Sequence, residues 1–163
     1  MNEYEEKIKK YMDEHKVKGQ HLSFTQSCHS VAEAALAVGA SPEDFVKNIC
    51  LMDEQGNLIV AIVKGEDKVD KEVVAAAIHI SKIKMASPTQ ILLKTGYPCG
   101  GTPSFGYDAI FLIDTKVMEK EIVYSGGGSE NALVKMLPQE LQKANQGKIT
   151  KVRKCRLSSP KLF

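Results

Sequence analysis

The sequence lacks any run of about 18 apolar residues, which is the length that a membrane-spanning helix requires. It also lacks an apolar leader, because its first ten residues read MNEYEEKIKK and are mostly charged. These two absences predict a protein with no membrane segment and no secretory signal. We therefore expect a cytoplasmic location, where cysteine thiols stay reduced.

Closely spaced cysteines are missing as well. The four cysteines form no C-x-x-C pair, and Cys28 and His29 are a single adjacent pair without a second cluster. No metal site and no cofactor are predicted from them. We interpret Cys50 and Cys99 as packing residues rather than nucleophiles, since no flanking group would lower the pKa of either thiol.

Neither sign of charge dominates, since 22 lysines and arginines face 20 aspartates and glutamates. This balance argues against a protein that binds nucleic acid through a large excess of positive charge. The segment 147–156, GKITKVRKCR, is nevertheless basic. It is either a solvated terminal strand and tail or a local contact for a phosphate backbone, and both interpretations stay open.

Apolar spacing and turn residues predict helices and strands that alternate along the chain. Helices are expected at 3–16, 30–39, 69–80, 87–96 and 137–144. Ser30 is expected to cap the second helix and Asp70 the third, and Pro88 and Gly96 mark the two ends of the fourth. The EQGN turn at 54–57 predicts a hairpin. Strands are expected at 21–26, 46–53, 58–65, 109–114, 121–128, 131–136 and 148–154, with a short extended segment at 82–86. Several strands are joined by hairpin-length links, so the expected fold class is α/β or α+β with a mixed, curved sheet in one domain, 1–163.

A glycine-rich stretch at 95–108, TGYPCGGTPSFGYD, is the most unusual part of the sequence. It is not a P-loop, because Tyr107 and Asp108 stand where that motif needs a lysine and a hydroxyl residue. It follows a predicted helix and precedes a strand, which is the reverse of a dinucleotide-binding loop. Its glycines either form tight turns or let a ligand approach the main chain, whose free N–H groups would receive an oxygen atom.

A second glycine-rich stretch at 125–131, SGGGSEN, lies between two predicted strands. Three consecutive glycines exceed what an ordinary hairpin needs. The stretch is either a flexible connection or one wall of a pocket that it shares with the first stretch. The sequence has no Gly-x-Ser-x-Gly nucleophile elbow, so an esterase of that type is poorly supported.

Three segments in this order, FVKNICL, KIKMASPTQILLKTGYPCGGTPSFGYD and YSGGGSENALVKMLPQEL, resemble the YbaK/prolyl-tRNA synthetase-associated editing-domain family. The resemblance runs from about residue 20 to about residue 152. It implies a mixed, barrel-like sheet surrounded by helices, and hydrolysis of wrongly formed aminoacyl-tRNA. It implies aminoacyl-tRNA as the partner, held at its acceptor end, and leaves open an aminoacyl-tRNA synthetase as a second one. The chain is similar to the free-standing members, which act in trans.

The resemblance also assigns roles to residues. It implies catalytic roles for Lys47, Gly100 and Gly101, and substrate-binding roles for Thr102, Pro103, Phe105, Gly106, Gly126 and Gly127. Members that remove cysteine carry an aspartate shortly after the last glycine pair. Here that stretch reads SENALV, in which Glu130 or Asn131 would replace the aspartate.

An aminoacyl ester is already activated, so a site without a catalytic triad can hydrolyse it by positioning water and stabilising the oxyanion. We expect backbone N–H groups near Gly100 and Gly101 to face the ester carbonyl or the terminal adenosine. Lys47 would place its charge near the terminal phosphate or ribose. Pro103 and Phe105 would form the stiff walls of a small amino-acid pocket.

The expected substrates are tRNA(Pro), or a related tRNA, carrying a small wrong amino acid such as alanine, cysteine, serine or threonine. The alternative function is a non-catalytic module that binds the tRNA acceptor end or a nucleotide. Release of amino acid from a charged tRNA would distinguish the enzyme from the binding module.

Overall fold

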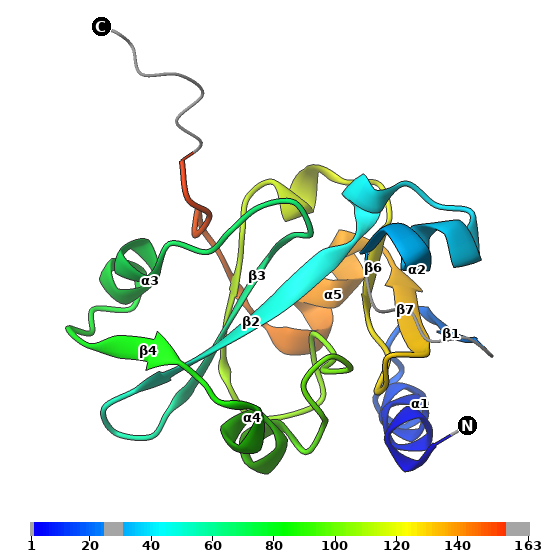
Figure 1. The fold of residues 1–163 in the computed structure, drawn as a ribbon, viewed down its shortest axis with the longest axis horizontal. Helices are drawn as coiled ribbons and strands as arrows, with labels where there is room; N and C mark the ends of the chain where they lie inside the picture. Colours follow the sequence, from blue (N-terminus) through cyan, green and yellow to red (C-terminus); the bar gives the residue numbers. More distant parts are fainter. Residues whose placement is uncertain (1, 25–30, 156–163) are drawn as a thin grey trace, which may run out of the picture.

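The computed structural model describes residues 2–24 and 31–155 (Figure 1). The helices are α1 Glu3–His15, α2 Val31–Val38, α3 Lys71–Ala77, α4 Pro88–Thr95 and α5 Pro138–Asn145, with 3₁₀ turns η1 Pro42–Asp44 and η2 Val117–Glu119. The strands are β1 Gln20–Ser23, β2 Val46–Asp53, β3 Leu58–Lys64, β4 Ile83–Met85, β5 Ile110–Ile113, β6 Val123–Gly126, β7 Ala132–Met136 and β8 Lys148–Ile149. Each predicted helix and strand thus has a counterpart in the described residues.

The strands form two sheets. One has the order β1-β7-β6 and is antiparallel, and the other has the order β4-β2-β3-β5-β8 with parallel pairs at β3–β5 and β5–β8. An isolated parallel bridge between Phe45 and Tyr124 links them. The predicted mixed α+β fold is therefore confirmed, although the described strands do not close into a barrel.

The two faces of β2 pack in different surroundings. Cys50 and Met52 belong to a core that also includes residues of α1, β7 and α5, whereas Leu51 belongs to a core with Val74 of α3. Because side chains alternate along a strand, odd-numbered residues of β2 lie on one face and even-numbered residues on the other. We call the even-numbered side the loop face and the odd-numbered side the helix face.

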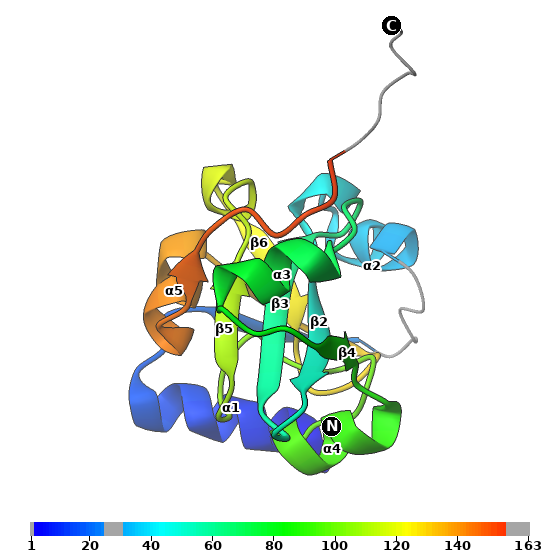
Figure 2. The same ribbon diagram turned by 90° about the vertical axis from the view of Figure 1, so that its left-hand side faces the viewer.

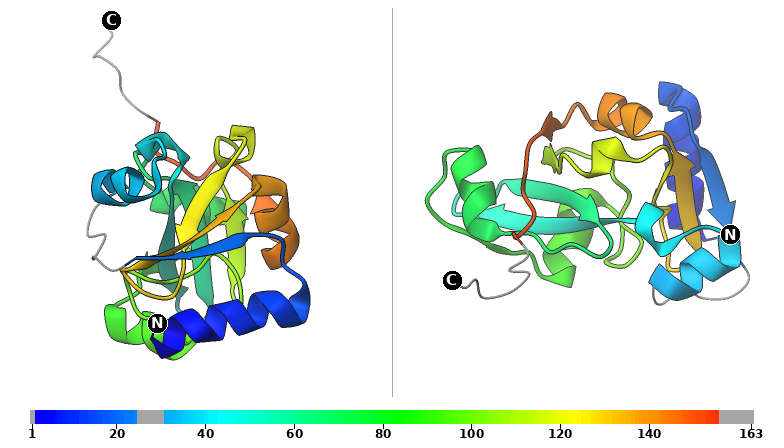
Figure 3. Two further views of the ribbon diagram at one scale, coloured as in Figure 1. Left: turned by 90° about the vertical axis from the view of Figure 1, so that its right-hand side faces the viewer. Right: turned by 90° about the horizontal axis from the view of Figure 1, so that it is seen from above.

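The views from the sides show what covers each face. In Figure 2, α3 lies in front of β3 and β2, on the helix face. In the left-hand view of Figure 3, the three-stranded sheet lies in front of the five-stranded one, and α1 runs below β1. The loop-face core is therefore enclosed between the two sheets. Within the described residues, no helix is both long and apolar enough to cross a bilayer.

The last predicted strand, 148–154, is wrong in its extent. Only Lys148 and Ile149 pair with β5. Beyond them the carboxylate of Asp114 accepts hydrogen bonds from the backbone N–H groups of Val152, at 2.8 Å, and Arg153, at 3.1 Å, and from the Arg153 guanidinium at 2.9 Å. This buried side chain, together with an isolated antiparallel bridge between Arg153 and Val69, holds residues 150–155, which we call the C-terminal strap.

The sequence signals at α4 are confirmed and position the first glycine-rich stretch. Ser87 caps the helix with a capping box to Gln90, Pro88 occupies the first turn, and Gly96 ends the helix with φ of 80°. The predicted cap Asp70 of α3 is confirmed as well. The predicted cap of α2 at Ser30, and the Cys28–His29 pair, lie outside the described residues.

Candidate functional site

The first glycine loop, residues 95–108, folds back on itself. Gly100 and Gly106 have φ of 94° and 98°, in the left-handed region that favours glycine. The N–H of Gly101 and the hydroxyl of Thr102 both donate to the carbonyl of Pro98, each at 3.0 Å. These bonds make the loop a compact turn with defined exposed and buried sides.

The second glycine loop, residues 125–131, docks directly onto the first. The N–H of Gly128 donates to the carbonyl of Gly101 at 2.8 Å. A Cβ atom at Gly126 would overlap the carbonyl oxygen of Thr102, and one at Gly101 would lie 2.5 Å from the Ser129 nitrogen. These glycines are required because two backbones of the protein touch, so the close approach inferred from the sequence is made here by the other loop.

Asn48 of β2 joins the two glycine loops to the five-stranded sheet. Its side-chain amide donates to the carbonyl of Thr102 at 2.9 Å, and its amide oxygen accepts from the Ser104 hydroxyl at 2.6 Å. The Ser104 hydroxyl lies 2.7 Å from that of Ser125, in the second loop. Both serines are buried, so this network is fully bonded inside the protein. Three distant segments are therefore joined through Asn48 and Ser104.

Lys47, the neighbour of Asn48, lies on the helix face. It pairs with Val63, whose side chain belongs to the core under α3. Burial lowers the pKa of the Lys47 ammonium, the nearby Asp67 carboxylate opposes this shift, and Lys68 adds to it. The structure thus brings Asn48, rather than Lys47, into contact with the glycine loops, and the predicted role of Lys47 stays a prediction.

One edge of β2 is unpaired beside these two residues. β4 pairs with this edge only from Leu51 to Asp53, and the bridge to β6 is made at Phe45. In the described part of the chain, no strand pairs with this edge at Lys47 and Asn48. A ligand placed over this gap could reach side chains on both faces of β2.

The roles expected for Gly101 and Phe105 need correction. The Gly101 N–H is already bonded to Pro98, so it does not face a substrate. Among the described residues, the N–H groups of Cys99, Gly100 and Thr102 have no backbone acceptor, and these three are the donors left in this turn. Phe105 is fully buried in the loop-face core, with its ring 6.0 Å from that of Tyr11, and so does not line a pocket.

The remaining predicted residues surround the contact between the loops. Pro103 is buried and its carbonyl accepts from the Tyr107 hydroxyl at 2.6 Å. Gly106 packs against α1, where a Cβ atom would lie 3.3 Å from Ile8. A Cβ atom at Gly127 would lie 2.6 Å from the backbone of Leu133, so this glycine is fixed by β7.

Glu130 and Asn131 differ in their position relative to the first loop. Glu130 is exposed, and its side chain would contact a Cβ atom at Gly100 at 3.6 Å. The Asn131 N–H donates to the Ser129 hydroxyl at 3.0 Å. Glu130 is therefore the residue of this pair that lies against the exposed part of the first glycine loop.

Cys50 and Cys99, which are both predicted to be packing residues, differ in their exposure to solvent. Cys50 is buried on the loop face, and burial together with nearby Cys99 raises its pKa to about 12, so the packing role is confirmed. Cys99 is exposed, so its assignment to packing was wrong. It follows Pro98 in the turn that begins the first glycine loop, where no core is available to cover it.

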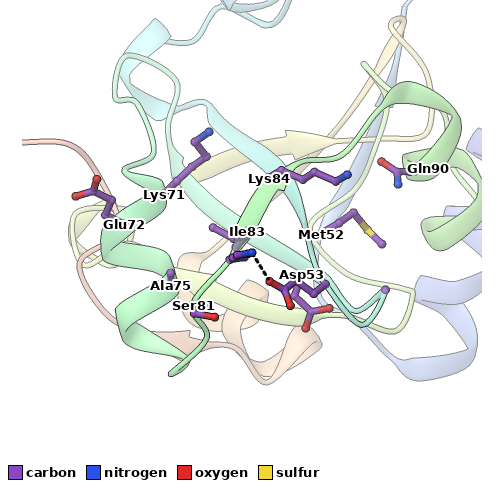
Figure 4. A pocket seen from close by; sticks show the side chains of 12 residues that line it. Met52, Asp53, Lys71, Glu72, Ala75, Ser81, Ile83, Lys84 and Gln90 are labelled. Atoms are coloured by element: carbon purple, nitrogen blue, oxygen red, sulfur yellow. Dashed lines mark ion pairs between the residues drawn. The ribbon is translucent and has the colours of Figure 1, made fainter.

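A surface hollow of about 990 Å³ lies away from these loops, between α3, β4 and the β2–β3 hairpin (Figure 4). It is lined by residues that include Met52, Lys71, Ile83 and Lys84, and an ion pair of 3.7 Å joins Lys82 to Glu54 there. None of the predicted site residues lines this hollow. Within the described residues, no group of three or more metal-ligating side chains gathers as a metal site.

Comparison with known protein families shows which family contains these features. Residues 25–144 match the family described as the aminoacyl-tRNA editing domain, and this range contains both glycine loops and Asn48. The chain belongs to the aminoacyl-tRNA editing domain family. The resemblance inferred from the three sequence segments is thereby confirmed, and this editing domain acts in aminoacyl-tRNA editing.

The chain is also similar to one relative in sequence and to solved structures in fold. The uncharacterized protein YwhH of Bacillus subtilis (strain 168) is 27% identical over 128 residues, which are 77% of this chain and 81% of that protein. The hypothetical protein APE2540 has a TM-score of 0.82 at 25% identity, covering 91% of this chain and 99% of that one. A candidate trans-editing enzyme for prolyl tRNA synthetase has a TM-score of 0.86 at 20% identity, covering 95% of this chain and 99% of that one. This likeness shows that the two proteins share a fold.

Proposed function

We propose that this editing domain hydrolyses the ester of a mischarged aminoacyl-tRNA where the two glycine loops meet β2. The observation that carries the proposal is the contact of Gly101 with Gly128, fastened to the sheet by Asn48, inside the segment that matches the editing family. The proposed substrates are tRNA(Pro), or a related tRNA, bearing alanine, cysteine, serine or threonine.

The reaction adds water to the ester carbonyl carbon and then breaks the bond from that carbon to the ribose oxygen. The free amino acid leaves as a carboxylic acid, and the ribose oxygen takes a proton from the attacking water. The N–H groups of Gly100, which is exposed, and of Thr102, which is buried beside it, would donate to the developing oxyanion. One donor of this kind is commonly worth about 3 kcal/mol in a transition state.

Lys47 would contact the substrate from the helix face of β2, opposite the glycine loops, at the unpaired edge of this strand. Its ammonium group would approach the terminal phosphate or the ribose as a compact positive charge. Partial burial lowers the pKa of this ammonium group, and the nearby Asp67 carboxylate opposes that shift. The proposal therefore uses both faces of β2, with Asn48 holding the loops and Lys47 holding the acceptor end.

The amino-acid pocket would be small because the loop residues around it are already packed. Thr102 and Pro103 are buried, and Gly126 leaves no room for a Cβ atom against Thr102. Binding alone distinguishes side chains by only roughly 1–3 kcal/mol per methylene, so steric exclusion of larger amino acids is the more effective selection. Small wrong amino acids fit this restriction.

The test uses the isolated chain, acting in trans, with tRNA(Pro) charged with alanine, cysteine, serine or threonine. The wild type should release at least one amino acid faster than the uncatalysed ester loses it. Lys47→Ala should slow release at least about tenfold, since it removes the positive charge of the protein that would hold the acceptor end in place. The matched control, Lys82→Ala, changes an exposed lysine of the distant hollow and should keep the wild-type rate.

The competing function is a binding module without catalysis. It is favoured by the Gly101 N–H, which is bonded inside the turn and leaves fewer donors for an oxyanion. Titration with uncharged and charged tRNA(Pro), together with the release assay, distinguishes the two functions. Binding without release of any amino acid, or full activity in Lys47→Ala, would contradict the corresponding part of our proposal.

A further inference from the structure

Glu5 is a buried carboxylate that lies outside the segment that matches the editing family. The matched residues begin at 25, whereas Glu5 belongs to α1 and is only 3% exposed. It occupies the same helical stripe as Ile8 and Met12, where an apolar residue would be the ordinary choice. A carboxylate at such a position is costly unless its oxygens are hydrogen bonded.

Both oxygens of this carboxylate are used, and one of them holds the second glycine loop. Oε1 accepts from the Ser23 hydroxyl of β1 at 2.7 Å, and Oε2 accepts from the Ser129 hydroxyl at 2.6 Å. The Ser129 oxygen in turn accepts from the N–H of Asn131 at 3.0 Å. Burial would raise the pKa of Glu5, but these two hydroxyls and nearby His21 lower it overall.

The backbone of the second loop also rests on α1 and β1. A Cβ atom at Gly128 would lie 2.7 Å from the Tyr4 carbonyl oxygen and 2.9 Å from the Glu5 nitrogen. His21 of β1 donates from Nε2 to the carbonyl of Gly127 at 2.8 Å. Gly128 then bonds to Gly101 of the first loop. A continuous series of contacts therefore runs from Glu5 to the proposed oxyanion donors.

We propose that Glu5 is a positioning residue of the editing site, which fixes the second glycine loop through Ser129 and thereby sets the place of the first glycine loop. This inference rests on the proposed function. It assigns to the N-terminal segment, residues 2–24, a part in the site that the family match does not cover. Glu5 itself does not touch the substrate in this assignment.

The experiment compares three variants in the full chain. Glu5→Gln keeps the shape but removes the charge, and Ser129→Ala removes the bond to the loop. Ser23→Ala removes the other bond of the same carboxylate, which leads to β1 and not to the loop. For each variant we would measure kcat and KM for the mischarged tRNA that the wild type hydrolyses best, the unfolding midpoint, and hydrogen exchange of the amides at 99–106.

Glu5→Gln and Ser129→Ala should each lower kcat on the order of 10- to 100-fold with little change in KM, since a small displacement of positioned donors has that effect. Their double variant should lose no more than the larger single loss, because both act through one contact. Exchange at 99–106 should accelerate in both. Ser23→Ala should keep kcat and loop exchange near wild type even if its unfolding midpoint falls.

Equal losses in Ser23→Ala and Ser129→Ala, or losses that follow the unfolding midpoint alone, would overturn the inference. Unchanged loop exchange in both Glu5→Gln and Ser129→Ala would overturn it as well. A wild type that hydrolyses no aminoacyl-tRNA would contradict the proposed function instead. In that case accelerated exchange at 99–106 in the two loop variants would still establish the structural link from Glu5.

Discussion

The two faces of β2 are fixed by different chemistry. On the loop face, neutral groups do the work: the Asn48 amide, two serine hydroxyls and glycines that allow backbones to touch. On the helix face, charged groups lie beside an apolar core: Lys47 lies near Asp67 and Lys68, and Asp114 with Arg153 holds the C-terminal strap. The strap bonds back to the same region, since the Lys154 N–H donates to the carbonyl of Lys68.

This difference suggests separate tasks for the adjacent residues Lys47 and Asn48 of β2. The neutral contacts tolerate little displacement, because each one either fills space in a closely packed region or completes a buried hydrogen bond. Charged contacts act over longer distances and respond to pH and salt. The loop face therefore suits the positioning of reacting atoms, and the helix face suits the stabilisation of the fold and the attraction of an anionic partner.

The largest effect is expected from Gly126→Ala, which tests the loop face by sterics. The added Cβ atom would meet the rigid carbonyl of Thr102, so the loops must separate. We expect the free energy of unfolding to fall by roughly 3 kcal/mol or more, measured by urea denaturation. The control is Gly39→Ala. Gly39 has φ of 66°, but no atom of the described residues outside its chain neighbours would lie within 4 Å of the added Cβ atom, so the variant should lose only about 1 kcal/mol from backbone strain. Equal losses would contradict the docking of the loops.

A smaller loss is expected from Asp114→Asn, which tests the helix face. Burial by itself would raise the pKa of Asp114, but hydrogen bonds from Val152, Lys116 and Arg153 outweigh it and lower the pKa. A lowered pKa means that the ionised group stabilises the fold above the pKa of the unfolded chain, about 4, and that this stabilisation is lost as pH falls through the folded pKa.

Asp114→Asn should therefore lower the free energy of unfolding by about 2 kcal/mol at pH 7, and the difference from wild type should shrink below about pH 4. Unfolding experiments at a series of pH values would measure it. The rate of ester hydrolysis at pH 7 should stay near wild type, because the strap does not touch the glycine loops. A constant difference across all pH values would show that the charge of Asp114 is not what holds the strap.

The smallest effect is expected at the two thiols beside the site. Iodoacetamide should modify exposed Cys99 in the native protein, whereas Cys50, whose pKa burial and nearby Cys99 raise to about 12, should react only after unfolding. Peptide mass spectrometry would follow both. Cys99→Ser should keep the hydrolysis rate within about twofold, since no thiol nucleophile is proposed. A large loss of rate would instead show that the Cys99 thiol takes part in the reaction.

The order of the elements could be predicted from the sequence because their ends carry strong local signals. Pro88 and Gly96 predict the limits of α4, and the EQGN turn predicts the β2–β3 hairpin, as the structure has them. The extent of the last strand was predicted wrongly because its pattern is local, whereas the bonds that hold the strap come from Asp114 and from residues 68–70, each more than thirty residues away. Sequence periodicity does not contain that contact.

The candidate site was harder to predict than the fold. Residues on both faces of β2 are apolar and buried, as Cys50, Leu51 and Met52 show, so alternation could not indicate which face Lys47 or Asn48 takes. Phe105 stands in a glycine-rich loop, yet it fills the core, because the loop turns inward. Glu5 lies in a first helical turn that also contains Glu3 and Glu6, so its charge does not distinguish it. Only its spacing from Ile8 could have predicted its burial.

The most direct test of the central claim is the rate of amino-acid release by Asn48→Ala, measured with the mischarged tRNA that the wild type hydrolyses best and corrected for the folded fraction. Asn48 joins both glycine loops to β2, so we predict a loss of kcat on the order of 10- to 100-fold. Asn57→Ala, which removes an amide from the distant hairpin, should retain the wild-type rate. Wild-type hydrolysis by folded Asn48→Ala would contradict the claim that the editing site is where the two loops meet this strand.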